Sequence, residues 1–156
     1  MSLDLHIIST KPVKKVSSGV YVRSQGKTKE LKTREEIQEW FPGSDIEIRE
    51  YETNEIFDGN ITHNLCEMAS HVIIPGGYTL YDLLWKPSIN TITQEYIDSV
   101  KKGLEYLNSH KEDLEQYNPS NGWGSYETLL DFTQSFIASL DSLDLSSDTY
   151  TIYVSV

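Results

Sequence analysis

The sequence predicts an α+β fold: a small, mostly antiparallel sheet, built from N-terminal strands and one C-terminal strand, with a helical block packed against it. Apolar and polar residues alternate near the start of the chain and at its end, which is the period of a strand. After Asp58-Gly59 the apolar residues recur mostly at helical spacing. The apolar C-terminal strand needs a partner, and the N-terminal strand is the simplest one. We expect a single domain over residues 1–156.

The strand predictions follow from alternation and from turn residues. "LDLHIIS" (3–9) places three large apolar side chains on one face and His6 on the other. "GVYVRS" (19–24) and "KTKELK" (27–32) flank Gln25-Gly26 and predict a hairpin. "SDIEIREYE" (44–52) predicts another strand with one solvent-exposed face.

Helix starts are predicted where a capping residue precedes an apolar stripe. Thr33 and Glu36 have the spacing of a capping box, and Pro42-Gly43 ends the short helix that they open. Further starts are expected at three places in the second half of the chain: Thr79, Thr91 with Gln94, and Ser125. The helical block is therefore expected to hold most of the core-forming side chains of that half.

The net charge of −11 is unevenly distributed. Residues 11–34 carry eight Lys and Arg against Glu30 alone, whereas no Lys or Arg follows Lys111. The overall charge repels nucleic acid, and we expect two solvated faces. Two sharper interpretations stay open: a phosphate-binding edge in segment 11–34, and an acidic surface for a basic partner, including one that imitates DNA phosphates.

Targeting signals and disulfides are not expected. The first ten residues lack the basic start and apolar run of a secretory signal, and no window approaches the roughly 18 apolar residues of a membrane span. Cys66 is the only cysteine, so no internal disulfide forms. These features predict a cytoplasmic protein without a membrane partner.

The segment "DGNITHNLCEMASH" (58–71) concentrates polar and titratable residues at an expected helix start. Either Asn60 or Asn64 can cap that helix, which places Thr62 and His63 within its first turn. Exposed amides and the helix dipole there favour an anionic group and a neutral imidazole. The segment is therefore either an anion-binding or general-base site, or an ordinary capped helix start.

Metal and cofactor motifs are not found. His63, Cys66 and His71 do not share one helical face, so their spacing does not favour a metal site. Cys66 fits an inert buried thiol better than a nucleophile. Because Gly-rich phosphate loops, paired zinc-ligand motifs and nucleophile elbows are also missing, we expect no cofactor and no metal.

The stretch "NPSNGWGSYE" (118–127) places Trp123 between two glycines. Its backbone has little local restraint, so the indole has to be held by packing or by a ligand. If Trp123, Trp85 and His63 converge, they line a pocket with aromatic walls and a few polar groups.

Three ordered motifs resemble those of a family of short proteins encoded in bacterial genomes and phages. The motifs are "NITHNLCEMA" (60–69), "LLWKP" (83–87) and "YNPSNGWGSYETLLDF" (117–132). The family has no established activity. The resemblance implies a common polar and aromatic set: Asn60, Thr62, His63, Asn64, Trp85, Asn121, Gly122, Trp123 and Tyr126.

Three functions are compatible with these features. The first is a soluble binding module whose polar and aromatic pocket takes a small, anionic ligand or a partner protein. The second is a hydrolase or transferase for an anionic substrate, with His63 as general base, oriented by Asn60 or Asn64. The third is an acidic interaction or inhibitor protein. The ligand-binding residues expected for the module are Asn60, Thr62, Asn64, Trp85, Asn121, Trp123 and Tyr126.

Overall fold

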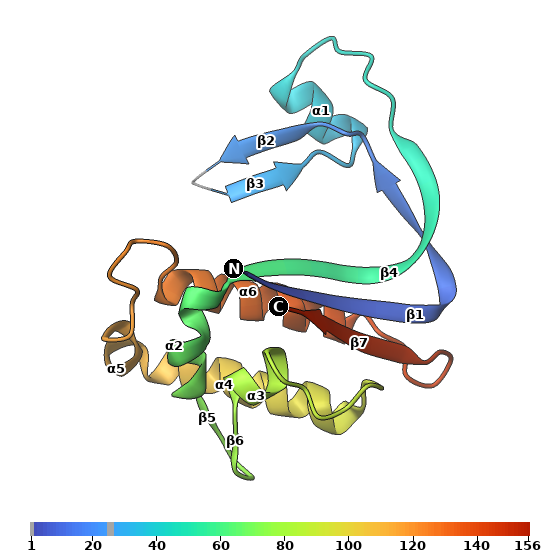
Figure 1. The fold of residues 1–156 in the computed structure, drawn as a ribbon. Helices are drawn as coiled ribbons and strands as arrows, with labels where there is room; N and C mark the ends of the chain where they lie inside the picture. The colour runs from blue at the N-terminus through green and yellow to red at the C-terminus, as the bar shows by residue number, and fades with distance from the viewer. Residues whose placement is uncertain (1, 25–26) are drawn as a thin grey trace. The chain divides into compact units, whose positions relative to one another are not determined.

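A computed structural model describes residues 2–24 and 27–156 and confirms the α+β class (Figure 1). By its internal contacts the chain divides into unit 1, Met1–Lys11 with Glu55–Val156, and unit 2, Pro12–Asn54. The single domain expected from the sequence stays a prediction. Among the described residues, no helix combines the length and hydropathy that a membrane-spanning helix requires.

A three-stranded sheet has the order β4-β1-β7, from β4 (Arg49–Thr62), β1 (Ser2–Ser17) and β7 (Tyr150–Ser155). Residues 2–11 of β1, residues 55–62 of β4 and the whole of β7 belong to unit 1. β7 pairs antiparallel with β1, so that Ile152 lies opposite Ile7, and the pairing predicted between the two ends of the sequence is confirmed. The alternation in β1 buries Leu3, Leu5 and Ile7 completely and leaves His6 on the outer face.

The inner face of this sheet packs against the helices. The two long helices, α4 (Gln94–Ser109) and α6 (Tyr126–Asp141), contact each other, and their apolar stripes join the β1 side chains in one core around Phe136. The short elements of this half are η1 (His63–Leu65), α2 (Cys66–Ser70), β5 (Ile73–Ile74), β6 (Tyr78–Thr79), α3 (Leu80–Leu84) and α5 (Lys111–Glu115).

Unit 2 contains the predicted hairpin and the predicted short helix. β2 (Tyr21–Ser24) pairs antiparallel with β3 (Lys27–Glu30), and the connecting Gln25-Gly26 lies outside the described residues. α1 (Arg34–Trp40) begins after Thr33, whose hydroxyl accepts the backbone N–H of Glu36. A separate small core forms from three buried side chains of this unit: Val22, Leu31 and Ile37.

The expected helix start at Asn60 or Asn64 is wrong, because β4 continues to Thr62 and is followed by η1 and the short α2. Alternation persists past Asp58-Gly59: Phe57 packs on the core and Ile61 is buried, while the residues between them face outward or lack a side chain. A Cβ on Gly59 would lie 2.5 Å from the Phe57 ring. The missing side chain thus gives Phe57 room to cover the strand.

Two further boundaries differ from the sequence prediction. Residues 44–48 are irregular, so the strand expected over 44–52 begins only at Arg49. The long helix begins at Gln94, with Thr93 rather than Thr91 as its cap. Thr91 instead forms a bridge with Thr151 next to the sheet. Both threonines are suitable caps by residue type, and the bridge to Thr151 excludes the earlier one.

Thr93→Ala should destabilise the protein more than Thr91→Ala. The Thr93 hydroxyl accepts the backbone N–H of Tyr96 at 3.2 Å, and losing a cap costs about 1 kcal/mol. The exposed Thr91 side chain caps nothing, so its removal should change the free energy of unfolding by less than about 0.5 kcal/mol. Urea denaturation of both variants measures this difference, and equal losses would contradict the observed helix start.

Candidate functional site

The two distant segments that the sequence suggests as one site are in contact. Thr62 ends β4, and its hydroxyl accepts the backbone N–H of Asn64, which turns the chain into η1. The Asn64 side-chain amide donates to Asn121 Oδ1 and to the carbonyl of Trp123, both at 3.4 Å. One asparagine therefore joins the end of β4 to the loop that precedes α6.

The loop that carries Trp123 is held by its own hydrogen bonds. Asn121 Oδ1 accepts the backbone N–H of Trp123 at 3.0 Å, and Asn118 Oδ1 accepts that of Tyr126 at 2.7 Å. Gly124 has a φ of +92°, and a Cβ there would lie 2.7 Å from Thr62 Cγ2. A glycine is required for this close approach, so the backbone on both sides of the indole has a defined conformation.

The Trp123 side chain itself is 72% exposed. Most of the residue is open to solvent, although hydrogen bonds hold its backbone in place. The sequence leaves two ways to hold this indole, packing or a ligand. A ring this exposed is not held by packing within unit 1. The exposed ring and the polar side chains of Asn64 and Asn121 form a surface that we call the Trp123 patch.

A shallow depression borders the Trp123 patch. Its volume is about 500 Å³, and its lining is mainly polar: Asn64, Glu67, Gln116, Tyr117, Asn118, Pro119, Ser120 and Asn121. The His71 ring stacks on Tyr117, with 4.0 Å between the ring centroids. Glu67, His71 and Tyr117 were not expected at the site, because only the packing of α2 beside the loop after α5 brings them together.

His63 is fixed by Trp85 rather than by an asparagine. The Trp85 indole N–H donates to His63 Nδ1 at 3.1 Å. An indole nitrogen can only donate, so Nδ1 carries the lone pair and the ring proton of the neutral imidazole lies on Nε2. Trp85 is buried and stacks on Tyr81, with centroids 5.8 Å apart. This packing sets the orientation of the imidazole.

This hydrogen bond argues against His63 as a general base. A neutral imidazole accepts a proton through its one free lone pair, and here that lone pair is occupied by the indole N–H. The expectation that Asn60 or Asn64 orients the ring is wrong. Asn60 projects from β4 and donates to Asp4, while Asn64 contacts the Trp123 loop.

Two other expected ligand-binding residues belong to the core. Tyr126 is 2% exposed, and its hydroxyl donates to the carbonyl of Leu107. Burial raises the pKa of this phenol. Trp85 is buried as well, so both side chains are part of the core and do not line a pocket. Asn64, Asn121 and Trp123 are the expected residues that come together at the surface.

A second cavity, of about 330 Å³, lies beside α3 and the start of α4. Its lining is Tyr78, Asp82, Leu83, Lys86, Ser88, Ile89, Thr93, Glu95, Tyr96 and Ser99. The Tyr96 hydroxyl donates to the carbonyl of Leu83 at 2.7 Å, and burial raises the pKa of Tyr96. The sequence contains no local motif for this cavity, because its lining comes from three separate elements.

Comparison with known proteins identifies no relative. No family model matches the chain, and neither the curated proteins nor the solved structures yield a match. The resemblance to the family of short bacterial and phage-encoded proteins therefore stays a prediction, and the function has to be argued from the geometry of the site.

NMR of the ring nitrogens should find the proton of the neutral His63 imidazole on Nε2. Trp85→Phe removes the indole donor and should produce a mixture of the two neutral tautomers. His110, whose ring bonds to Ser109 and stacks on Tyr106, serves as the internal reference. A wild-type His63 with its proton on Nδ1 would contradict the assigned hydrogen bond.

Proposed function

We propose that this protein is a binding module for a partner protein, and that a basic segment of the partner docks on the Trp123 patch. The observation that carries the proposal is the combination of a 72% exposed indole with a backbone that two asparagines and two glycines hold in place. A cytoplasmic location and a bacterial or phage origin are part of the proposal.

An exposed tryptophan on an ordered loop has the properties of an interface anchor. Tryptophan is enriched among the residues that dominate binding energy at protein interfaces, where its truncation costs about 2 kcal/mol or more. A loop that is already ordered loses less conformational entropy on binding than a flexible one. The hydrogen bonds of Asn64 and Asn121 provide this preorganisation.

The distribution of charge supports a basic partner over an anionic ligand. Unit 1 contains five Lys and Arg against 16 Asp and Glu, while unit 2 contains eight of each, so the net charge of −11 resides in unit 1. Glu67 lines the depression beside the Trp123 patch. A cationic segment is therefore attracted to this unit, and an anionic one is repelled. The proposal thus combines the binding module with the acidic interaction protein.

The enzymatic alternative has weaker support. It needs His63 to accept a proton, and the ring's acceptor nitrogen is bonded to Trp85. The Nε2–H of such a ring suits hydrogen-bond donation to a partner carbonyl. His63 is half-buried beside Asn64, so it fits the edge of a docking surface.

The test is an array of synthetic 15-residue peptides of basic, neutral and acidic composition, probed with the labelled protein. Basic peptides that contain an aromatic or large aliphatic residue should bind best, and Trp123→Ala should weaken their binding at least tenfold. Binding should also fall steeply as salt is raised, because the attraction is between exposed charges.

Trp40→Ala is the matched control, since Trp40 is also an exposed tryptophan but lies on α1 of unit 2. It should bind the same peptides as the wild type. Equal binding by Trp123→Ala and the wild type, or an equal response to basic and acidic peptides, would refute the docking proposal.

A further inference from the structure

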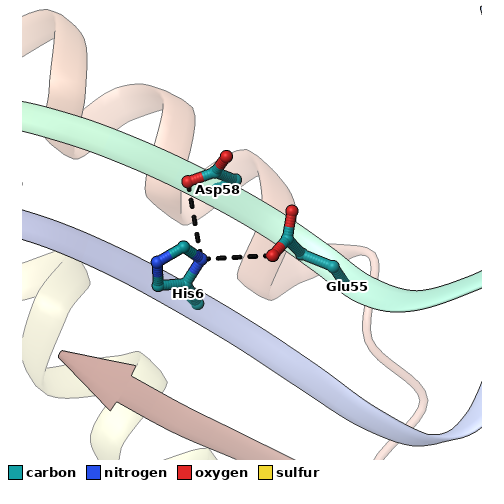
Figure 2. Close-up of side chains that lie close together, drawn as sticks. All are labelled: His6, Glu55 and Asp58. Atoms are coloured by element: carbon teal, nitrogen blue, oxygen red, sulfur yellow. Dashed lines mark hydrogen bonds and ion pairs between the residues drawn. The ribbon is translucent and has the colours of Figure 1, made fainter. Parts of the chain in front are cut away.

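Three side chains with metal-binding groups gather on the outer face of the sheet in unit 1. His6 projects from β1, and Glu55 and Asp58 project from the neighbouring β4 (Figure 2). His6 Nδ1 lies 3.2 Å from Glu55 Oε2 and 3.4 Å from Asp58 Oδ1. All three candidate ligand atoms lie within 4.8 Å of one another. We call this group the His6 cluster.

The distances from His6 Nδ1 to the two carboxylates match the spacing of ligands around a metal ion. The His6 Nδ1–Glu55 contact at 3.2 Å is also an ordinary hydrogen bond, but one Nδ1–H can point to only one of the two carboxylates. Ligands about 2.0–2.1 Å from a tetrahedral zinc ion lie about 3.3–3.4 Å from each other. The two distances from the imidazole therefore match those around a bound cation, and the two carboxylate oxygens lie within 4.8 Å of each other.

The local course of β4 also brings the carboxylates together. Glu55 and Asp58 are separated by an odd number of positions, so strict alternation would point them to opposite faces of the sheet. Both nevertheless reach the same His6 nitrogen, and the intervening Ile56 and Phe57 both pack against the core. A break in alternation of this kind re-aims side chains in strands.

The neighbours of His6 restrain the ring and favour a cation. Tyr153 lies opposite His6 on β7, with 5.9 Å between the ring centroids, and covers the side away from β4. The cluster faces solvent, since the His6 side chain is 21% exposed and that of Asp58 61%. It belongs to the unit that carries the whole net charge of −11.

We propose that His6, Glu55 and Asp58 bind a divalent transition-metal ion, with Zn²⁺ as the best-matched species. An imidazole combined with carboxylates suits Zn²⁺ better than Mg²⁺ or Ca²⁺, which prefer oxygen ligands alone. Three protein ligands leave a position for water or for a group from a partner. This site was not expected from the sequence, and it does not rest on the proposed docking at Trp123.

Isothermal titration of the tag-free, chelator-treated protein with Zn²⁺ tests the proposal. The wild type should bind one equivalent, and both His6→Gln and Asp58→Asn should weaken binding at least tenfold. These side chains lie on the outer face of the sheet, so circular dichroism should show unchanged folding. His110→Gln and Asp113→Asn make the same chemical changes away from the cluster and should bind like the wild type.

A second measurement on the unmodified protein keeps the test independent of the variants. Zn²⁺ should shift the NMR signal of His6 Nδ1 at one equivalent, while those of His63, His71 and His110 stay in place, and millimolar Mg²⁺ should not reverse the shift. The absence of saturable Zn²⁺ binding, equal affinity in His6→Gln, or a shift at a different histidine would overturn the proposal.

Discussion

The two-residue period of β1 is the constraint on which the rest of unit 1 depends. β1 is the middle strand of the sheet, so both of its edges are paired and its register is tied to β4 and to β7. One face supplies Leu3, Leu5 and Ile7 to the core. The opposite face then has to present His6 outward. A slip of one residue would exchange the two faces and bury the imidazole in place of leucine.

The length of β4 determines in the same way where the Trp123 patch forms. Because the strand continues to Thr62, the chain enters η1 at the end of the sheet and brings Asn64 to the loop before α6. A long helix from Asn60 would have put these side chains on a helix face. The short turn instead lets one amide bridge two segments that are 57 residues apart.

Much of the fold follows from local sequence, because caps and alternation are local properties. The caps at Thr79 and Ser125 lie where they are predicted, and the pairing of β1 with β7 follows from the apolar alternation of both strands. The error at Asn60 has a physical reason. Asn, Thr and Gly are suitable both for a helix start and for a strand beside a large aromatic side chain. The strand forms here because the Phe57 ring packs against α6.

The two surfaces differ in how far the sequence anticipates them. The motif around Trp123 is contiguous, so its glycines and asparagines reveal a constrained loop. The exposure of the indole depends on what packs nearby and has no local signal. The His6 cluster has no contiguous motif, since its ligands lie 49 residues apart and a departure from strand alternation is needed to unite them. Long-range pairing, which a single sequence does not encode locally, creates this site.

The excess of acid in unit 1 connects both proposals physically. Like charges repel one another in the folded state and oppose compaction, so an excess of 11 acidic groups has a cost in stability. A divalent ion at the His6 cluster and a basic segment at the Trp123 patch would each reduce that repulsion when bound. The two interactions act over different ranges. Salt weakens the attraction between exposed charges that lie more than about 10 Å apart, whereas metal coordination depends on direct contact between ligand and ion. Raising the ionic strength should therefore weaken docking far more than metal binding, although both use the same excess of negative charge.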